Sequence, residues 1–382
     1  MNGKISDNSK RVIFVSSSVG AGHHQAAAAL MARLGEVRPE VQTEFLDALE
    51  FVPWWFRLVY GGGYNVLVTR LPRIYGVGYR WHNRPDTPRR TLLERNRLLV
   101  ERLVLRRLRR HLLDRRPTLV MATHYLAMPM IGRLIGRGER LRMFAVITDN
   151  EPHRWWFAEN VERYFVANPR VRELISRWGI EPGRITVSGI PVHPKWTAGL
   201  DRQSIFRDWR LPADRPIVIL SGGTFFTVGP VERIAQAILD NTDAHVVVLA
   251  GNNKKLLAAL ASLPESGRRL TPVAFTDRVQ ELAEVASVFI TKPGGLMTSE
   301  CIAKGVAMVL TKPVPGQEAA NAEMLAREGA AITAPATEDV IREVIRLLET
   351  PAAVEALRDN ARRLYQPATE TIVSTICEAI DS

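Results

Sequence analysis

Short apolar runs that end in glycine or polar residues recur along the whole chain. The first is RVIFVS at residues 11–16, and similar runs stand at 118–122, 143–147, 164–167 and 185–188. The stretches between them are long enough for helices. Parallel strands need such crossover segments, and their carboxyl ends meet at one edge of the sheet. The pattern therefore predicts an α/β protein with a ligand-binding edge.

The stretch at residues 291–321, TKPGGLMTSECIAKGVAMVLTKPVPGQEAAN, holds the densest group of candidate ligand-binding residues. It follows an apolar run at 286–290, and a helix is expected to begin at about Thr298. The exposed N–H groups of that helix start would bind an anion such as a diphosphate. Glu300 is expected in the first turn, where its carboxylate would accept hydrogen bonds from sugar hydroxyls. An ordinary pair of glycine-rich loops is the alternative.

The second half of the chain repeats the same strand–turn–helix pattern. A strand at 216–220 ends in Ser221-Gly-Gly-Thr224, and a strand at 306–310 precedes a turn at 313–318. Prolines at 191, 194, 212 and 216 mark a linker, so we expect two α/β domains in series. Helices near 339–349, 352–364 and 369–381 complete the chain, and the last of them could cross back onto the first domain.

In the first half, histidines and a carboxylate follow the predicted strands. His23 and His24 begin a helix after two glycines. A helix N-terminus keeps an imidazole neutral, and a neutral imidazole can accept a proton from a hydroxyl nucleophile. The sequence does not choose between the two, and a histidine that caps a loop is the alternative. His124, Asp149 and His153 follow later strands and are expected at the same edge.

An aromatic and basic region separates the apolar run at 11–16 from the run at 118–122. Residues 51–81 hold nine aromatic residues and four arginines without any acid, and residues 89–116 form one or two basic amphipathic helices. A membrane interface attracts this composition, with rings at headgroup level and arginines on phosphates. The formal charge of +11 is consistent with an anionic partner. The alternatives are stacking on nucleic-acid bases, burial in a helical lobe and an ordinary solvated helix face.

Composition limits the remaining possibilities. The two cysteines, Cys301 and Cys377, give neither a disulfide framework nor a metal-binding spacing. No run has the length of a membrane-spanning helix, and the N-terminus lacks the apolar core of a signal peptide. No cluster of metal ligands stands at a strand end, so no metal is expected. A cytoplasmic protein is predicted.

These segments resemble a known family. ITKPGGLMTSE and KPVPGQEAANAEM resemble the C-terminal domain of GT-B glycosyltransferases of family 28. SSSVGAGHHQAA, TDNEPHRWWFAENVERYFVAN and SGIPVHPKW resemble the N-terminal domain of monogalactosyldiacylglycerol synthases and processive diacylglycerol glucosyltransferases. The resemblance runs from about residue 11 to 365. It implies two Rossmann-like parallel-sheet domains facing a central cleft: an acceptor-binding, membrane-docking domain at 1–197, a UDP-sugar-binding domain at 198–365, and a helix at 366–382 that could return to the first.

The resemblance also implies roles for individual residues. His23 falls on the base that deprotonates the acceptor hydroxyl, with Asp149 and His153 in support. Glu300 falls on the ribose-binding carboxylate, and Phe275 and Val279 fall where uracil binds. The other implied donor-binding residues serve the diphosphate and the donor sugar: Gly22, Ser221, Gly222, Gly223, Lys292, Gly294, Gly295, Thr298, Gln317, Glu318 and Asn321. The implied acceptor and membrane residues are Trp54, Trp55, Phe56, Tyr60, Arg106, Arg107 and His124.

The predicted function is transfer of a hexose, with glucose favoured over galactose, from a UDP-sugar to diacylglycerol or a glycosyl-diacylglycerol. Neither a cofactor nor a metal is expected. The expected location is the anionic inner face of the cell membrane, without nucleic acid as a partner. The alternatives are transfer of N-acetylglucosamine to a lipid-linked cell-wall precursor, a UDP-sugar epimerase of the same architecture, and a basic nucleic-acid-binding protein.

Overall fold

The computed structural model describes residues 10–18, 20–63, 77–78, 92–222 and 230–382. The chain divides into two compact units, each built around its own parallel sheet. The first unit contains Met1–Pro194, Pro315–Gln317 and Pro367–Ser382, and the second contains Lys195–Val314 and Glu318–Gln366. Gly223 and the aromatic residues of 64–76 and 79–91 lie outside the described residues.

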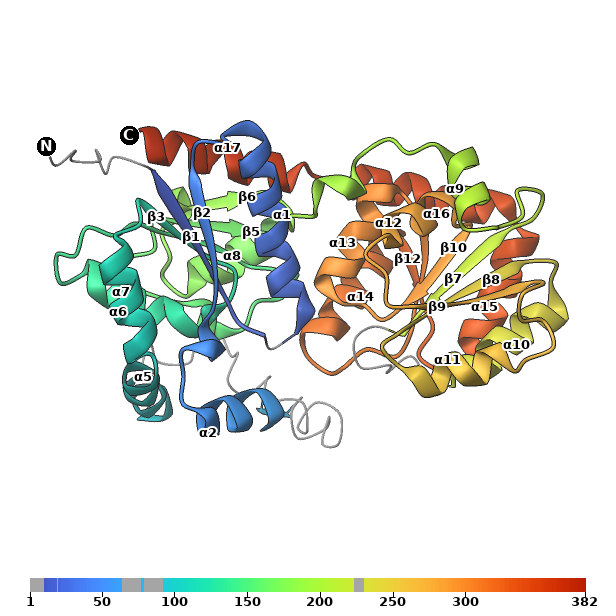
Figure 1. Ribbon diagram of the computed structural model, residues 1–382, viewed down its shortest axis with the longest axis horizontal. Coiled ribbons are helices and arrows are strands. Elements are labelled where there is room, and N and C mark those ends of the chain that lie inside the picture. Colours follow the sequence, from blue (N-terminus) through green and yellow to red (C-terminus); the bar gives the residue numbers. More distant parts are fainter. Residues whose placement is uncertain (1–9, 19, 64–76, 79–91, 223–229) are drawn as a thin grey trace, which may run out of the picture. The chain divides into compact units, whose positions relative to one another are not determined.

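The sheet of the first unit has six parallel strands in the order β2-β1-β3-β4-β5-β6 (Figure 1). Apolar and β-branched residues make most of these strands fully buried, as expected for a parallel sheet covered on both faces. The strands are β1 (Arg11–Ser16), β2 (Gln42–Asp47), β3 (Leu119–Ala122), β4 (Met143–Val146), β5 (Arg163–Val166) and β6 (Ile185–Val187).

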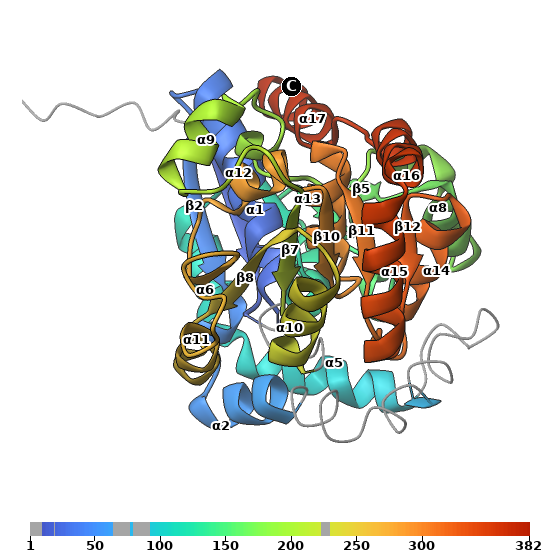
Figure 2. The same cartoon turned by 90° about the vertical axis from the view of Figure 1, so that its right-hand side faces the viewer.

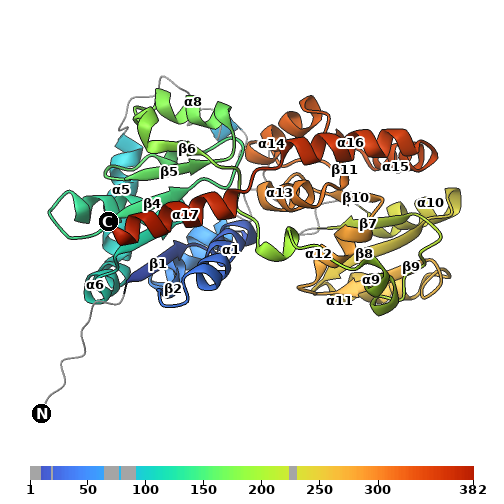
Figure 3. The ribbon, with the colours of Figure 1, turned by 90° about the horizontal axis from the view of Figure 1, so that it is seen from above.

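Alternate residues of each strand face opposite layers of helices. Val12 and Phe14 face α1 (Ala21–Val37) and α17 (Ala368–Asp381), which lie side by side (Figure 3). Ile13 and Val15 belong to the core on the other face. That core includes residues of α5 (Leu92–Val104), α6 (Arg106–Arg115), α7 (Met128–Ile135) and α8 (Pro169–Arg177).

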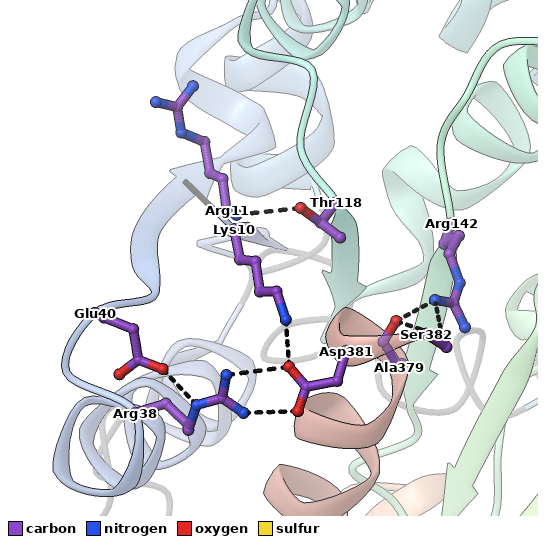
Figure 4. A network of polar contacts seen from close by, with 9 residues as sticks. All are labelled: Lys10, Arg11, Arg38, Glu40, Thr118, Arg142, Ala379, Asp381 and Ser382. Atoms are coloured by element: carbon purple, nitrogen blue, oxygen red, sulfur yellow. Dashed lines mark hydrogen bonds and ion pairs between the residues drawn. The ribbon is translucent and has the colours of Figure 1, made fainter. Parts of the chain in front are cut away.

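The last helix is attached to the first unit by both apolar and polar contacts. Asp381 bonds to Lys10 and Arg38, and Arg142 donates to the carbonyl of Ala379 (Figure 4). At the other end of α17, the Thr369 hydroxyl donates to the Val192 carbonyl at 2.7 Å. Helix α17 thus belongs to the first unit, although it follows the second unit in the sequence.

The aromatic and basic region is helical where it is described. Trp54–Arg57 form α2, and Leu58–Gly62 continue it as a π-helix. Gly61 and Gly62 lie inside this π-helix, so these glycines do not interrupt the helical hydrogen bonding. The basic stretch forms two helices, α5 and α6, and in α6 the buried Leu108 and Leu112 alternate with exposed arginines.

The sheet of the second unit also has six parallel strands, in the order β12-β11-β10-β7-β8-β9. One face packs on α10 (Val231–Asn241), α11 (Lys254–Ala261), α15 (Thr337–Glu349) and α16 (Pro351–Leu364), and α10 and α15 lie side by side (Figure 2). The strands are β7 (Ile217–Ser221), β8 (His245–Gly251), β9 (Leu270–Ala274), β10 (Val288–Thr291), β11 (Ala307–Leu310) and β12 (Ala331–Thr333). Three further helices are α12 (Val279–Val285), α13 (Gly295–Lys304) and α14 (Gln317–Arg327), while α9 (Arg202–Asp208) follows the proline-rich linker.

Each strand order reverses at one place. In the first sheet the reversal lies between β1 and β3, and in the second it lies between β7 and β10. Crossovers run to opposite sides of the sheet at such a point, which leaves a crevice beyond the carboxyl ends of the two strands. His23 and His124 follow β1 and β3, whereas Ser221 ends β7 and Lys292 follows β10. The predicted site residues thus cluster at both reversals.

Candidate active site

His23 lies in the first turn of α1, directly after the loop that ends β1. The helix begins after Gly20, whose φ of 100° lies in the region that glycine adopts without strain. This turn directs the imidazole towards the ends of β3 and β4. Its Nδ1 lies 3.0 Å from the Thr123 carbonyl and 2.9 Å from the Thr148 hydroxyl.

These two contacts fix the tautomer of His23. A carbonyl oxygen only accepts hydrogen bonds, so Nδ1 must carry the hydrogen and donate it to Thr123. The lone pair of the neutral ring then lies on Nε2. Burial is the main cause that lowers the pKa of His23 to about 4, and the Thr123 carbonyl opposes this shift in part. His23 is therefore neutral at pH 7, with Nε2 able to accept a proton.

Three further rings surround His23. The His124 ring meets it edge-on at 4.7 Å, and the fully buried Trp156 lies 6.2 Å away. Tyr125 stacks on His124 at 4.2 Å. Burial lowers the pKa of His124 well below the usual value, with a smaller contribution from the charge of His23. The Nδ1 atom of His124 accepts from the Leu126 N–H at 3.2 Å, so its Nε2 carries the hydrogen.

His153 belongs to the same aromatic group but does not touch His23 in the contacts described. It lies 4.5 Å from Trp155 and 6.3 Å from Tyr125, ring centre to ring centre. Its Nδ1 accepts from the N–H of Trp155 at 3.3 Å and so caps a short 3₁₀ helix, Arg154–Trp156. This position favours a structural role for His153, which holds the short helix that carries Trp155 and Trp156.

Several buried polar atoms around the end of β1 and β3 have no hydrogen-bond partner among the described residues. They are the hydroxyls of Ser16, Ser17 and Thr123 and the indole N–H of Trp156. A native core rarely leaves such groups unsatisfied. Their concentration beside His23 indicates a place where a polar ligand or water completes the hydrogen bonding.

The structure separates His23 from its neighbour His24. His24 points to the end of β2, where its Nε2 lies 3.8 Å from Asp47, and its ring meets Phe45 at 5.0 Å. Asp47 in turn accepts from the N–H groups of Ser18 and Leu49. His24 thus supports the loop after β1. Gly22 precedes both histidines inside α1, and Asp149 follows Thr148 directly.

In the second unit, α13 begins at Gly295 after the cap Gly294. The expected start at about Thr298 is wrong, and Glu300 is the sixth helical residue rather than part of the first turn. The sequence pattern placed the start too late because the two glycines looked like loop. The first N–H groups of any helix have no intrahelical acceptor, and at α13 no side chain caps them either. They are therefore available to an anion.

Glu300 is buried beside two residues to which the sequence gave no role, Lys195 and Trp196. Trp196 donates a side-chain hydrogen bond to Glu300. Burial nevertheless raises the pKa of Glu300 to about 8, against the opposing charge of Lys195. The carboxyl is therefore neutral at pH 7 in the free protein, so it can donate one hydrogen bond as well as accept.

The turns after β10 and β11 are tied to each other by side chains. Lys292 Nζ lies 2.7 Å from Glu318 Oε1, and Glu318 Oε2 accepts from the Val314 N–H at 3.0 Å. The fully buried Asn321 donates to the Pro293 carbonyl at 2.9 Å. These contacts hold the two loops in register. Lys292, Glu318 and Asn321 therefore organise the site before any ligand arrives, and Gln317 begins α14.

The remaining predicted donor residues lie at or near the same sheet edge. Ser221 is buried at the end of β7, and Gly222 follows it. Thr298 is buried, and its hydroxyl donates to the Gly294 carbonyl at 2.9 Å. Phe275 follows β9 with 72% of its surface exposed, and Val279 begins α12. An exposed ring at a strand end is unusual for a stable core and is available for a flat ligand.

Of the predicted acceptor and membrane residues, Trp54 and Trp55 lie on an exposed apolar surface of α2 and its π-helical continuation. Trp54 is 77% exposed, and Leu58 and Val59 are 65% and 67% exposed. Phe56 faces inward and stacks on Tyr60 at 5.3 Å, while Arg106 and Arg107 are exposed on α6. No helix in the described residues is long and apolar enough to cross a membrane. Within the same residues, no three His, Cys, Asp or Glu side chains gather as a metal site.

Solved structures of similar fold define the class of the protein. MurG of Acinetobacter baumannii matches with a TM-score of 0.58 at 17% identity, over 97% of this chain and 99% of that one. The Staphylococcus aureus MnaA–UDP structure matches with a TM-score of 0.62 at 12% identity, over 97% of both chains. With the two parallel sheets, these matches confirm the predicted GT-B fold.

Sequence relatives identify the family. Residues 23–192 match the monogalactosyldiacylglycerol (MGDG) synthase family. Residues 227–380 match the glycosyltransferase family 28 C-terminal domain. A processive diacylglycerol beta-glucosyltransferase of Bacillus cereus is 30% identical over 71% of this chain and 70% of its own. One of Bacillus pumilus is 31% identical over 64% of each chain, so that match spans less than two thirds of the relative. The chain belongs to this family of glycosyltransferases, which confirms the predicted family and enzyme class.

Proposed function

We propose that the protein transfers a hexose, with glucose as the first choice and galactose as the second, from a UDP-sugar to diacylglycerol or a glycosyl-diacylglycerol. The activity for which the Bacillus relatives are named supports the lipid acceptor and glucose. The matching description of a monogalactosyldiacylglycerol synthase supports galactose. A fold neighbour with bound UDP supports the nucleotide.

The single observation that carries the proposal is the fixed tautomer of His23. Thr123 and Thr148 hold Nδ1, so Nε2 is the proton acceptor. In the proposed reaction Nε2 takes the proton of the acceptor hydroxyl while its oxygen attacks the anomeric carbon of the donor sugar. The bond from that carbon to the UDP oxygen breaks, and the diphosphate leaves with the electron pair. Asp149, next to Thr148, is proposed to orient the acceptor or stabilise the imidazolium.

The second unit is proposed to bind the donor. The N–H groups at the start of α13 stabilise the charge that develops on the leaving diphosphate. Glu300 binds the ribose hydroxyls, Phe275 lies against the uracil, and Gln317, Glu318 and Asn321 shape the place of the sugar. Transfer is proposed to need neither a metal nor a cofactor.

The exposed apolar surface of α2 is proposed to insert into the membrane interface. Its tryptophans and aliphatic side chains suit headgroup depth, and Arg106 and Arg107 of α6 suit anionic phosphates. The protein would then act as a peripheral protein at the inner face of the cell membrane. No nucleic acid is expected as a partner.

The test is transfer in liposomes that contain diacylglycerol and anionic phospholipid, with EDTA present. UDP-glucose, UDP-galactose and UDP-N-acetylglucosamine are supplied in parallel. The proposal expects a glycosyl-diacylglycerol product from UDP-glucose above the other donors. The absence of diacylglycerol product with every donor, from protein that binds UDP, would contradict it.

The same assay separates the alternatives. Product only from UDP-N-acetylglucosamine and a lipid-linked cell-wall precursor would favour an N-acetylglucosamine transferase that acts on this precursor. Binding to nucleic acid that falls steeply with salt, without any transfer, would favour the basic nucleic-acid-binding protein.

A further inference from the structure

A cavity of about 420 Å³ lies in the first unit between α5, α6 and α7. Its volume is in the range of small-molecule sites, roughly 300–1,000 Å³. None of its lining residues has a role in the proposed transfer. The cavity is therefore a second candidate site.

Positive charge dominates the rim of this cavity. Five arginines line it, Arg97, Arg102, Arg109, Arg133 and Arg137, against three glutamates. Guanidinium groups bind phosphate oxygens in pairs, which makes grouped arginines a phosphate-binding surface. The rim thus favours an anionic head group.

The floor of the cavity is apolar. Leu98, Met130, Leu134 and Phe157 line it, and Met130 and Leu134 are only 7% and 5% exposed. An apolar floor under a cationic rim suits an amphiphile rather than a free anion. A volume of this size matches one acyl chain better than two.

A buried carboxyl adds a polar requirement. Glu101 is 3% exposed, and its Oε1 accepts from Arg97 Nη1 at 3.0 Å. Its Oε2 has no hydrogen-bond partner in the part of the chain that the structure describes. Burial raises the pKa of Glu101 to about 7, although Arg97 opposes the shift. A ligand hydroxyl would satisfy this oxygen.

We propose that the cavity binds a phosphate-bearing amphiphile with one acyl chain and a free hydroxyl, which is the chemistry of a lysophospholipid. The phosphate lies on the arginines, the hydroxyl on Glu101 and the chain along the apolar floor. The inference is independent of the proposed transfer.

The cavity also connects to the rings around His23. The Arg97 guanidinium lies 4.8 Å from the centre of the Trp155 ring, and Trp155 lies 5.5 Å from Tyr125. Tyr125 stacks on His124, which contacts His23. Arg97 therefore lies at one end of a chain of ring contacts whose other end is His23.

The test measures binding of lauroyl lysophosphatidate to the full chain by calorimetry, below the critical micelle concentration of the lipid. Inorganic phosphate, laurate and monolauroylglycerol are the comparison ligands. The proposal expects one molecule of lysophosphatidate per chain, bound at least about tenfold more tightly than each comparison ligand. Equal binding by laurate, by monolauroylglycerol or by phosphate would overturn it.

Two variants assign the binding to this cavity. Met130→Trp fills the floor, and the double change Arg133→Ala with Arg137→Ala removes rim charge. Each is expected to weaken lysophosphatidate binding about tenfold or more, while Arg110→Ala, an exposed residue of α6 outside the cavity, leaves it unchanged. Thermal unfolding by circular dichroism confirms that each variant is folded. Wild-type affinity in the double arginine variant, whose changes are at the rim, would place the ligand elsewhere.

Discussion

The two units share one architecture but present different chemistry at their sheet edges. At the reversal of the first sheet, the side chains are imidazoles, aromatic rings and unsatisfied hydroxyls, and His23 is held neutral by burial. At the reversal of the second, the turns are tied by Lys292, Glu318 and Asn321, and backbone N–H groups start a helix. One edge is suited to moving a proton, and the other to holding an anion.

The difference also appears in the sign of the pKa shifts. Burial lowers the pKa of His23 and raises that of Glu300, so both groups are neutral at pH 7 without a ligand. In each unit the fold disfavours the charged form of the residue with the implied central role. A ligand that supplies hydrogen-bond partners for the charged form would shift each pKa back towards its usual value.

The largest expected effect is at His23. Replacement with alanine removes the proton acceptor, so transfer should fall by roughly 10²–10⁴-fold. His24→Ala is the matched control, because His24 is its chain neighbour but contacts Asp47. Initial rates in the liposome assay provide the measurement. Equal losses in the two variants would remove the distinction between these histidines.

The next effect is at Glu300 in the second unit. Glu300→Ala should weaken UDP binding by about 10–100-fold, the value of a lost hydrogen bond to a charged or strongly polar group. Glu300→Gln keeps a neutral group of the same shape. If the neutral carboxyl is the form that binds, this variant should lose less UDP affinity than Glu300→Ala. Calorimetric titration with UDP measures both. A larger loss for the glutamine variant would show that the ionised form binds the ribose.

A smaller effect is expected from substitutions on the exposed apolar surface of α2. Trp54→Ser with Leu58→Ser removes two exposed apolar side chains, so binding to anionic liposomes should weaken about tenfold or more. UDP binding should be unchanged, because the proposed donor site lies in the second unit. Co-sedimentation with liposomes measures the first quantity. Retained liposome binding would assign docking to other residues.

The smallest effects concern stability against pH. The folded pKa of His23 lies below its unfolded value of 6.5, so its contribution is complete above pH 6.5 and is lost as the pH falls towards 4. Glu300 has the opposite sign, because its raised pKa makes the folded state lose stability as the pH rises from 4.5 towards 8. His23→Gln should remove the loss of stability between pH 6.5 and 4, and Glu300→Gln the loss between pH 4.5 and 8, each by about 2–4 °C in Tm. Unchanged pH profiles of Tm would show that these groups are solvated.

The sequence predicted the fold well because the strands are short apolar runs with polar ends, separated by stretches long enough for helices. The strand ends before His124 and Asp149 were visible, and so was the gathering of His23 and His124 at one edge. It did not reveal that Thr148 holds Nδ1 of His23, because that contact joins two crossovers distant in sequence. The adjacent Asp149 drew attention instead, as a charged residue in a recognisable motif.

Other features depend on packing that has no local pattern. Trp196 and Lys195 reach Glu300 across the unit, and nothing in the HPKW segment indicates a carboxyl partner. The cavity near Glu101 arises where three helices meet, so single-helix periodicity described its arginines only as a basic face. Glycines also misled at the start of α13, since Gly294 caps this helix and Gly295 is its first residue. Tertiary contacts overrode their weak helix propensity.

The central claim is that the first unit performs proton transfer and the second binds the nucleotide. The most direct test measures UDP affinity and transfer rate for both His23→Ala and Glu300→Ala. We expect His23→Ala to bind UDP as the unchanged protein does and to lose transfer, whereas Glu300→Ala loses UDP affinity. Loss of UDP affinity in His23→Ala, or full transfer by that variant at saturating UDP-sugar, would contradict the account.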